Sequence, residues 1–96
     1  MSQSTSQSTT QKHTAFVGAP MTNQPVTAIP GIGKVLGNRL NENGYPDAPA
    51  VYGQYLKDGK DPVTFKADMK ADCGANSKQQ SDCHGAMKEW GDQHFH

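Results

Sequence analysis

The sequence predicts an all-α fold, a compact bundle of about five short helices that contains a helix-hairpin-helix motif. Three observations support this prediction. Ile32, Leu36 and Leu40 recur every four residues, the spacing of one face of a helix. A Gly-Ile-Gly turn at residues 31–33 leads directly into that helix, and glycine adopts backbone angles that other residues avoid. The remaining apolar residues recur at similar spacing between proline, glycine and capping residues.

The N-terminal half is predicted to form three helical segments. Residues 10–18 form the first helix, with Thr9 or Thr10 as its N-cap. Residues 25–29 form the very short first helix of the hairpin motif, and residues 34–43 form its second helix.

The C-terminal half is predicted to add three more. Residues 48–56 follow Asp47, which caps them, and the next helix begins at Pro62. The last helix begins after the loop at residues 74–78, where Asn76 or Ser77 is the cap. The predicted core comprises Phe16, Ile29, Ile32, Val35, Leu36, Leu40, Val51, Tyr55, Leu56, Phe65, Met69, Met87 and Trp90.

The chain is predicted to be one domain with two tails. Residues 1–9 form a Ser/Thr/Gln-rich tail that cannot offset the entropy of ordering and is expected to be disordered. Residues 10–93 form the domain, and residues 94–96 form a His-containing C-terminal tail. No apolar run is long enough for a membrane span or a signal peptide, so we expect a soluble intracellular protein without membrane insertion.

The Gly-Ile-Gly turn is a candidate phosphate site. Amides at a helix start have no partner inside the helix and lie at the positive end of its dipole, so those of Gly31, Ile32 and Gly33 suit an anion. Lys34 and Arg39 add positive charge nearby. Packing is the alternative explanation of these glycines. The formal net charge of zero means that DNA, if it binds, must use a local patch.

Other kinds of chemistry find little support in the sequence. There is no nucleophile with a base at suitable spacing and no P-loop, so we expect neither an enzyme nor a cofactor. His13 is interpreted as a surface or hinge histidine. A metal-binding module of His84, His94 and His96 is a weaker hypothesis, and no native metal site is expected. Cys73 and Cys83 are expected to be reduced, unless the intervening turn brings them within bridging distance.

Several short motifs appear in order along the chain: Thr10-Gln11-Lys12-His13, Pro20-Met21, Pro25-Val26, the Gly-Ile-Gly turn, Gly53-Gln54-Tyr55-Leu56, residues 73–79 and Lys88-Glu89-Trp90. Together they resemble the barrier-to-autointegration factor family, from about Thr10 to Trp90. The resemblance implies a small chromatin protein that binds double-stranded DNA through the hairpin motif and the loop before the last helix, in the nucleus and cytoplasm. The implied DNA-binding residues are Thr10, Gln11, Lys12, Gly31, Ile32, Gly33, Lys34, Val35, Arg39, Ala75, Asn76, Ser77 and Lys78. It also implies phosphorylation at Thr9 or Thr10, which would oppose DNA binding.

The chain departs from the family where members form a homodimer that bridges two duplexes and binds LEM-domain proteins. Lys57, Asp58, Thr64 and Asp68 stand where the family has large apolar residues, and Ala86 and Gly91 replace cysteines. Charges at these positions remove the apolar centre that a stable interface needs. We therefore expect a weak or different dimer, or loss of LEM-domain binding. The alternative to a DNA-binding protein is the same scaffold recruited for structural or self-assembling roles, with DNA binding reduced or lost.

Overall fold

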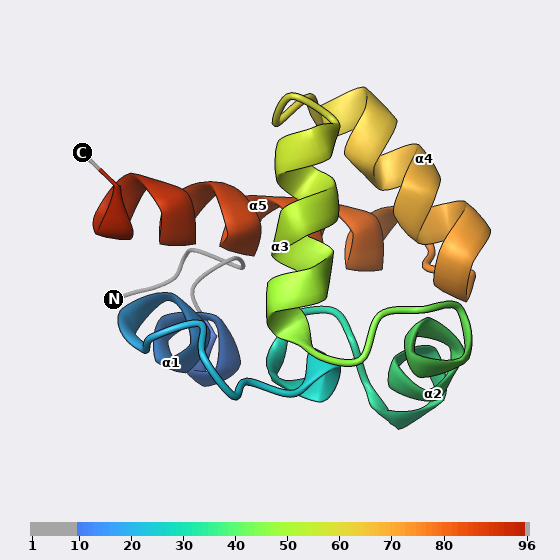
Figure 1. Cartoon of the computed structure of the whole chain (residues 1–96), viewed down its shortest axis with the longest axis horizontal. Helices are drawn as coiled ribbons and strands as arrows, with labels where there is room; N and C mark the ends of the chain where they lie inside the picture. The colour runs from blue at the N-terminus through green and yellow to red at the C-terminus, as the bar shows by residue number, and fades with distance from the viewer. Residues whose placement is uncertain (1–9, 96) are drawn as a thin grey trace.

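The computed structural model describes residues 10–95, and every regular element in that range is helical. The elements are α1 (Gln11–Gly18), the 3-10 helix η2 (Val26–Ala28), α2 (Lys34–Glu42), α3 (Ala48–Lys57), α4 (Pro62–Cys73) and α5 (Ser77–His94). The predicted all-α class is confirmed. In Figure 1, α5 runs behind α3, with α1 near its C-terminal end and α4 and α2 on the other side.

Side-chain caps determine where most helices begin. Thr10 Oγ1 accepts the His13 N–H at the start of α1, and Asp47 Oδ1 accepts the Ala50 N–H at the start of α3. Asp61 caps α4 in the same way, with Pro62 in the first turn, where a missing N–H costs nothing. These boundaries agree with the sequence prediction because each depends on neighbouring residues alone.

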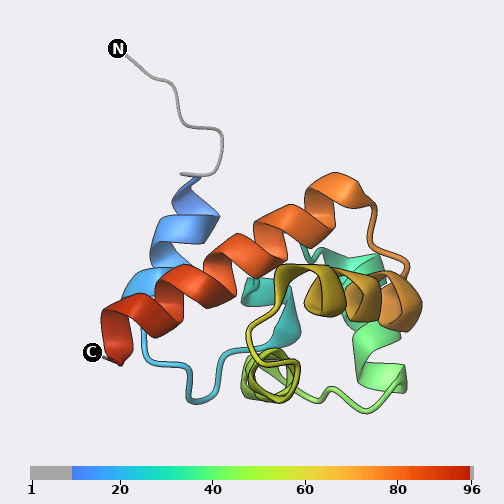
Figure 2. The same cartoon turned by 90° about the horizontal axis from the view of Figure 1, so that it is seen from above.

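Helix α5 is the longest element, and α1, α3 and α4 pack against it. It packs along α1 and α4, and it also contacts α3 (Figure 2). Its 18 residues correspond to about 27 Å of helix. The face that it turns inward consists of Cys83, Ala86, Met87 and Trp90, all buried.

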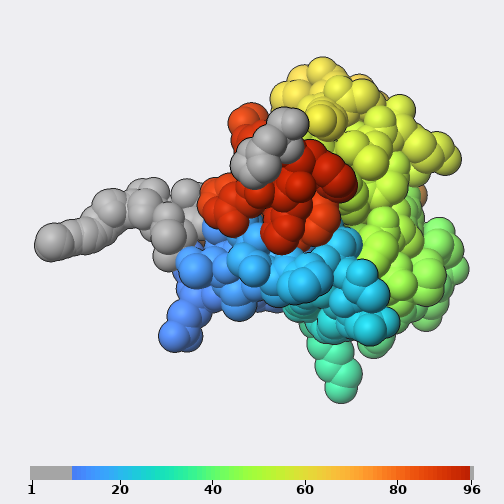
Figure 3. Space-filling model, turned by 60° about the vertical axis from the view of Figure 1, so that its left-hand side comes forward, coloured from blue at the N-terminus to red at the C-terminus, as the bar shows by residue number. Residues whose placement is uncertain are grey.

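The C-terminal end of α5 is fastened to the end of α1. The Trp90 indole N–H donates to the carbonyl of Ala19 at 2.8 Å, and His94 Nε2 lies 2.9 Å from the carbonyl of Val17. The His94 ring stacks on Trp90 with 4.2 Å between centroids. In Figure 3 this end of α5, in red, lies directly against α1 and the segment that follows it. His94, which was predicted to begin a tail, is therefore the last residue of a packed helix.

Of the thirteen predicted core residues all but two are buried, and the structure adds buried residues that the prediction omitted, among them Met21, Val26, Ala48, Tyr52 and Ala86. Val35 is 62% exposed and Leu56 is 46% exposed, although both were predicted to be buried. His13, interpreted from the sequence as a surface or hinge histidine, is only 7% exposed because its side chain enters the seam between α1 and α5. The hairpin motif itself is closely packed: a Cβ at Gly37 of α2 would lie 2.7 Å from the Thr27 side chain of η2.

Candidate nucleic-acid interface

The hairpin between η2 and α2 is a tight turn over residues 29–32. The Ile32 N–H donates to the Ile29 carbonyl at 3.0 Å, and Gly31 has a φ of +88° after Pro30, the pattern of a type II turn. The Ile32 side chain is fully buried. The Ile32 amide, one of the three predicted to receive a phosphate, is thus already engaged inside the turn.

The start of α2 is open. Gly33 is its N-cap and has no side-chain cap bond, so the amides of the first turn are left for an external acceptor. A Cβ at Gly33 would meet no described atom within 4 Å, and the side chains of Lys34 and Val35 are exposed. Of the two predicted glycines, Gly33 is the one that a ligand can approach.

The start of α5 is the second helix N-terminus of the site. Asn76 and Gln79 form a capping box, in which each side chain accepts the backbone N–H of the other residue at 2.8 Å. Ser77 and Lys78, in the first turn, are exposed. Ala75 is 2% exposed, so its side chain packs inward, and its carbonyl accepts a hydrogen bond from the side-chain amide of Gln80.

Lys12 joins α1 to the hairpin. Its Nζ donates to the Ile32 carbonyl at 2.7 Å, and burial lowers the pKa of this ammonium. Gln11 and Thr10 stand beside it, exposed, in and before the first turn of α1. The predicted residues at the start of α1 are therefore brought to the hairpin.

Gly31 joins the hairpin to α5. A Cβ at Gly31 would lie 2.7 Å from the backbone oxygen of Gln79 and 3.2 Å from the Asp82 Cβ. The first turns of α1, α2 and α5 consequently meet around one four-residue turn. The space at Gly31 that was predicted to admit a ligand is filled by α5.

Arg39 is bound to the C-terminal end of α4. Its Nη1 donates to the Cys73 carbonyl at 3.2 Å, at the negative end of α4 and beside Gly74. It thereby links α2 to the loop that leads into α5. Its predicted role near the hairpin is thus accompanied by a structural one.

Two residues of the site were missed at the sequence level. Gln79 completes the capping box, and the Asn-x-x-Gln spacing from Asn76 was a local signal for it. Asp82 lies beside Gly31 and its Oδ2 is 2.9 Å from Lys78 Nζ. A carboxylate thus partly neutralises one of the predicted DNA-binding lysines, and no local pattern indicated that it faces the hairpin.

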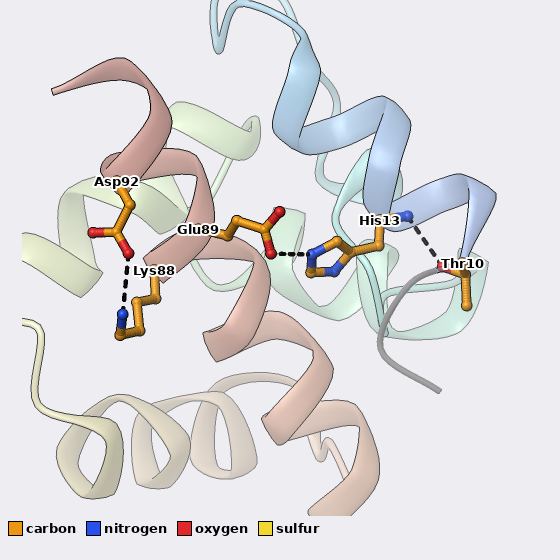
Figure 4. A network of polar contacts seen from close by, with 5 residues as sticks. All are labelled: Thr10, His13, Lys88, Glu89 and Asp92. Carbon is orange, nitrogen blue, oxygen red and sulfur yellow. Dashed lines mark hydrogen bonds and ion pairs between the residues drawn. The ribbon is translucent and has the colours of Figure 1, made fainter. Parts of the chain in front are cut away.

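A polar contact in the seam between α1 and α5 supports the position of α1. His13 Nε2 lies 3.1 Å from Glu89 Oε1, and the His13 N–H is bound by the N-cap Thr10 (Figure 4). The same figure shows Lys88 and Asp92 pairing along α5 at 3.0 Å. His13 is therefore a structural residue of the seam.

The four residues that were expected to alter a dimer seam fall in the α3–α4 region. Lys57 and Thr64 are exposed, whereas Asp58 and Asp68 are partly buried and share one hydrogen-bond donor. The Gln54 amide donates to Asp58 Oδ1 at 3.0 Å and to Asp68 Oδ2 at 3.2 Å. A hydrogen bond with Asp58, together with burial, raises the pKa of Asp68 to about 6. Asp58 and Asp68 thus form an intramolecular acidic pair.

The other candidate ligands lie apart. His84 packs against the rings of Tyr55 and Phe65, about 15 Å of helix away from His94, and His96 lies outside the described residues. Within residues 10–95 no group of three or more His, Cys, Asp or Glu side chains is arranged to hold a metal ion. Cys73 and Cys83 are both free and buried. None of the helices in the same range has the length and apolar character needed to cross a membrane.

Comparison with known proteins identifies the family of the chain. The family model described as barrier to autointegration factor matches residues 7–94. Barrier-to-autointegration factor of Danio rerio is 49% identical over 85 residues, which cover 88% of this chain and 94% of the relative. The Homo sapiens protein of that name is 48% identical with the same coverage, and the Drosophila melanogaster protein is 49% identical over 85% of this chain and 91% of its own. The chain belongs to the barrier-to-autointegration factor family.

Proposed function

We propose that this protein is a non-enzymatic chromatin protein that binds double-stranded DNA without sequence preference. The observation that carries the proposal is the meeting of three helix N-termini at one turn, with the open cap of α2 at Gly33 directly after it. Family membership supports the same function. Backbone amides and lysines contact phosphates rather than base edges, so such a surface holds a duplex without reading its sequence.

The expected contacts divide into amides and cations. The amides of Gly33, Lys34 and Val35 at the start of α2, and of Ser77 and Lys78 at the start of α5, face the phosphates. Lys12, Lys34 and Lys78 supply positive charge. Because only a few phosphates are neutralised, the affinity falls with salt less steeply than for a strongly basic protein.

A short random-sequence duplex, measured by fluorescence anisotropy in moderate salt, tests this function. Gly33→Glu is the informative variant. The backbone angles at position 33 suit any residue, and an added Cβ there meets no described atom within 4 Å. The new carboxylate should repel phosphate and abolish binding. Gly18→Glu is the matched control, since it makes the same charge change at another exposed glycine with no described atom within 4 Å. Absence of binding by the unaltered chain, or equal affinities for all variants, would refute the proposal.

Phosphorylation of Thr10 is the proposed way to release DNA. Thr10 is exposed, precedes Lys12 by two residues and caps α1. A phosphate there adds a charge of about −1.5 to −2 close to the phosphates of the duplex. Thr9, the other predicted acceptor, lies outside the described residues.

Self-association is the second part of the proposal. Bridging of two duplexes needs a second copy, and the acidic pair of Asp58 and Asp68 disfavours an apolar dimer seam at the α3–α4 region. We propose a weak dimer and reduced binding of LEM-domain proteins. Sedimentation at several protein concentrations tests this, and a stable dimer at micromolar concentration would contradict it. A chain that assembles further but binds no duplex would instead support the recruited-scaffold function.

A further inference from the structure

The two glycines of the Gly-Ile-Gly turn have different surroundings. At Gly33 a Cβ would meet no described atom within 4 Å, and the φ of −97° is open to any residue. At Gly31 a Cβ would lie 2.7 Å from the Gln79 backbone oxygen, and the φ of +88° disfavours any side chain. One glycine faces solvent, and the other faces the backbone of α5.

The contact at Gly31 is between two parts that the proposed function uses. Gln79 is in the capping box at the start of α5. Asp82 lies three residues further along the helix, and its Cβ would lie 3.2 Å from a Cβ added at Gly31. Backbone cannot move aside as the end of a flexible side chain can. A side chain at Gly31 must therefore displace the start of α5 from the hairpin.

A duplex presents phosphates at fixed spacing, so two helix N-termini bind them together only if the distance between the helices is fixed. We propose that Gly31 is a positioning residue, which acts on DNA through α5 by holding its first turn in register with the start of α2. This inference rests on the proposed function and assigns the two glycines separate roles. Gly33 admits the phosphate, and Gly31 admits α5.

A double-mutant cycle tests this role. Lys78→Gln, in the first turn of α5, is combined in turn with Gly31→Ala, Gly33→Ala and Gly44→Ala, and the affinity for a short random-sequence duplex is measured. Gly44 has a φ of +94° and no described atom within 4 Å of an added Cβ, so it reproduces the backbone cost at Gly31 without the contact. Gly33→Ala reproduces the added methyl group on the DNA face without displacing α5.

We expect coupling only for Gly31. Lys78→Gln should lower the affinity roughly three- to fivefold in the unaltered, Gly33→Ala and Gly44→Ala chains, and by less than about twofold in Gly31→Ala, where α5 is already out of register. The amide resonances of Gln79 and Asp82 should shift in Gly31→Ala and stay in place in Gly33→Ala. If Gly31→Ala is too unstable to measure, the whole cycle is repeated in chains that also carry Gly53→Ala. This substitution should stabilise α3, because alanine favours a helix and the added Cβ at Gly53 meets open space.

The outcomes separate this inference from the function on which it rests. Absence of duplex binding by the unaltered chain overturns both. Binding with an undiminished effect of Lys78→Gln in Gly31→Ala overturns only the positioning role, as does a Gly31→Ala chain whose Gln79 and Asp82 resonances are unmoved.

Discussion

Lys78 Nζ lies 2.9 Å from Asp82 Oδ2, one turn further along α5. This ion pair stands beside Gly31, at the point where α5 reaches the hairpin. The Lys78 side chain is 76% exposed, whereas that of Asp82 is 27% exposed. The carboxylate thus faces the proposed DNA surface and lowers the net positive charge of that surface.

Asp82→Asn is therefore expected to increase duplex affinity. The change frees Lys78 for phosphate and removes a repulsive charge, an effect of roughly two- to fivefold, equivalent to one exposed ion pair. The measurement is duplex anisotropy at low and moderate salt, with a larger gain at low salt. Asp92→Asn is the control, because Asp92 pairs with Lys88 at the same i, i+4 spacing and 3.0 Å, near the other end of α5. An equal gain in both variants would point to overall charge alone.

Substitutions of Lys12 and Lys34 should both weaken DNA binding, but only that of Lys12 should lower the stability of the fold. Lys12→Gln removes the charged donor from the Ile32 carbonyl, so we expect a loss of about 1 kcal/mol in the free energy of unfolding as well as weaker DNA binding. Lys34→Gln should weaken binding with unchanged stability, because Lys34 is exposed and makes no side-chain bond among residues 10–95. Urea unfolding and duplex titration of both variants check this. Equal stability losses would show that the Lys12 bond contributes nothing.

The hydroxyl of Tyr52 should be dispensable. It is buried without a hydrogen-bond partner among residues 10–95, and a Cβ at Gly91 would lie 2.8 Å from it. Tyr52→Phe is expected to leave stability equal or raise it by about 1 kcal/mol, because an unsatisfied polar atom is removed. Gly91→Ala should destabilise the chain, and the double variant should recover most of the loss. Thermal melts of the four chains test this, and additive effects would disprove the contact.

Stability should fall as the pH rises through about 6. The pKa of Asp68 is raised to about 6 from an ordinary value of 3.8, with the hydrogen bond to Asp58 as the main cause. The folded chain therefore keeps a proton that the unfolded chain has already released. This stabilisation is fully present below about pH 3.8 and is lost as the pH passes through about 6.

Urea unfolding of the unaltered chain and of Asp68→Asn, from pH 5 to 7.5, measures this effect. We expect the difference in free energy between the two to change by about 1 kcal/mol over that range, after allowance for partial exposure. The comparison is needed because burial lowers the pKa of His84, whose titration acts in the opposite direction. Identical pH dependence in both chains would mean that the two carboxyls share no proton.

Local patterns were sufficient to predict most of the fold. Asp47 and Asn76 cap their helices through neighbouring residues, so their positions follow from short stretches of sequence. Burial was harder to predict, because it depends on distant partners. His13 is buried against Glu89, which lies 76 residues further along the chain. Val35 is exposed although the adjoining Leu36 is buried, so its apolar character alone did not indicate its position.

The individual motifs of the candidate site could be predicted from the sequence, but the contacts that bring them together could not. The glycine turn and the cap at Asn76 are each visible in the sequence. That Gly31 closes on Gln79, and that Asp82 therefore faces the hairpin, depends on how the hairpin packs against α5. Spacing along one chain segment carries no information about such a contact.

The helices α1 and α5 and the hairpin form a closed triangle of mutual supports. Its corners are the bond from Lys12 to Ile32, the contact of Gly31 with Gln79, and the bonds from Trp90 and His94 to the end of α1. Each of these three contacts holds two of the three elements together. Weakening one contact should therefore make the other two less stable. Hydrogen exchange in α1, the hairpin and the first turn of α5 should accordingly follow a single cooperative opening. Loss of the contacts at the C-terminal end of α5 would then loosen the hairpin near its N-terminal end, about 27 Å away along the helix.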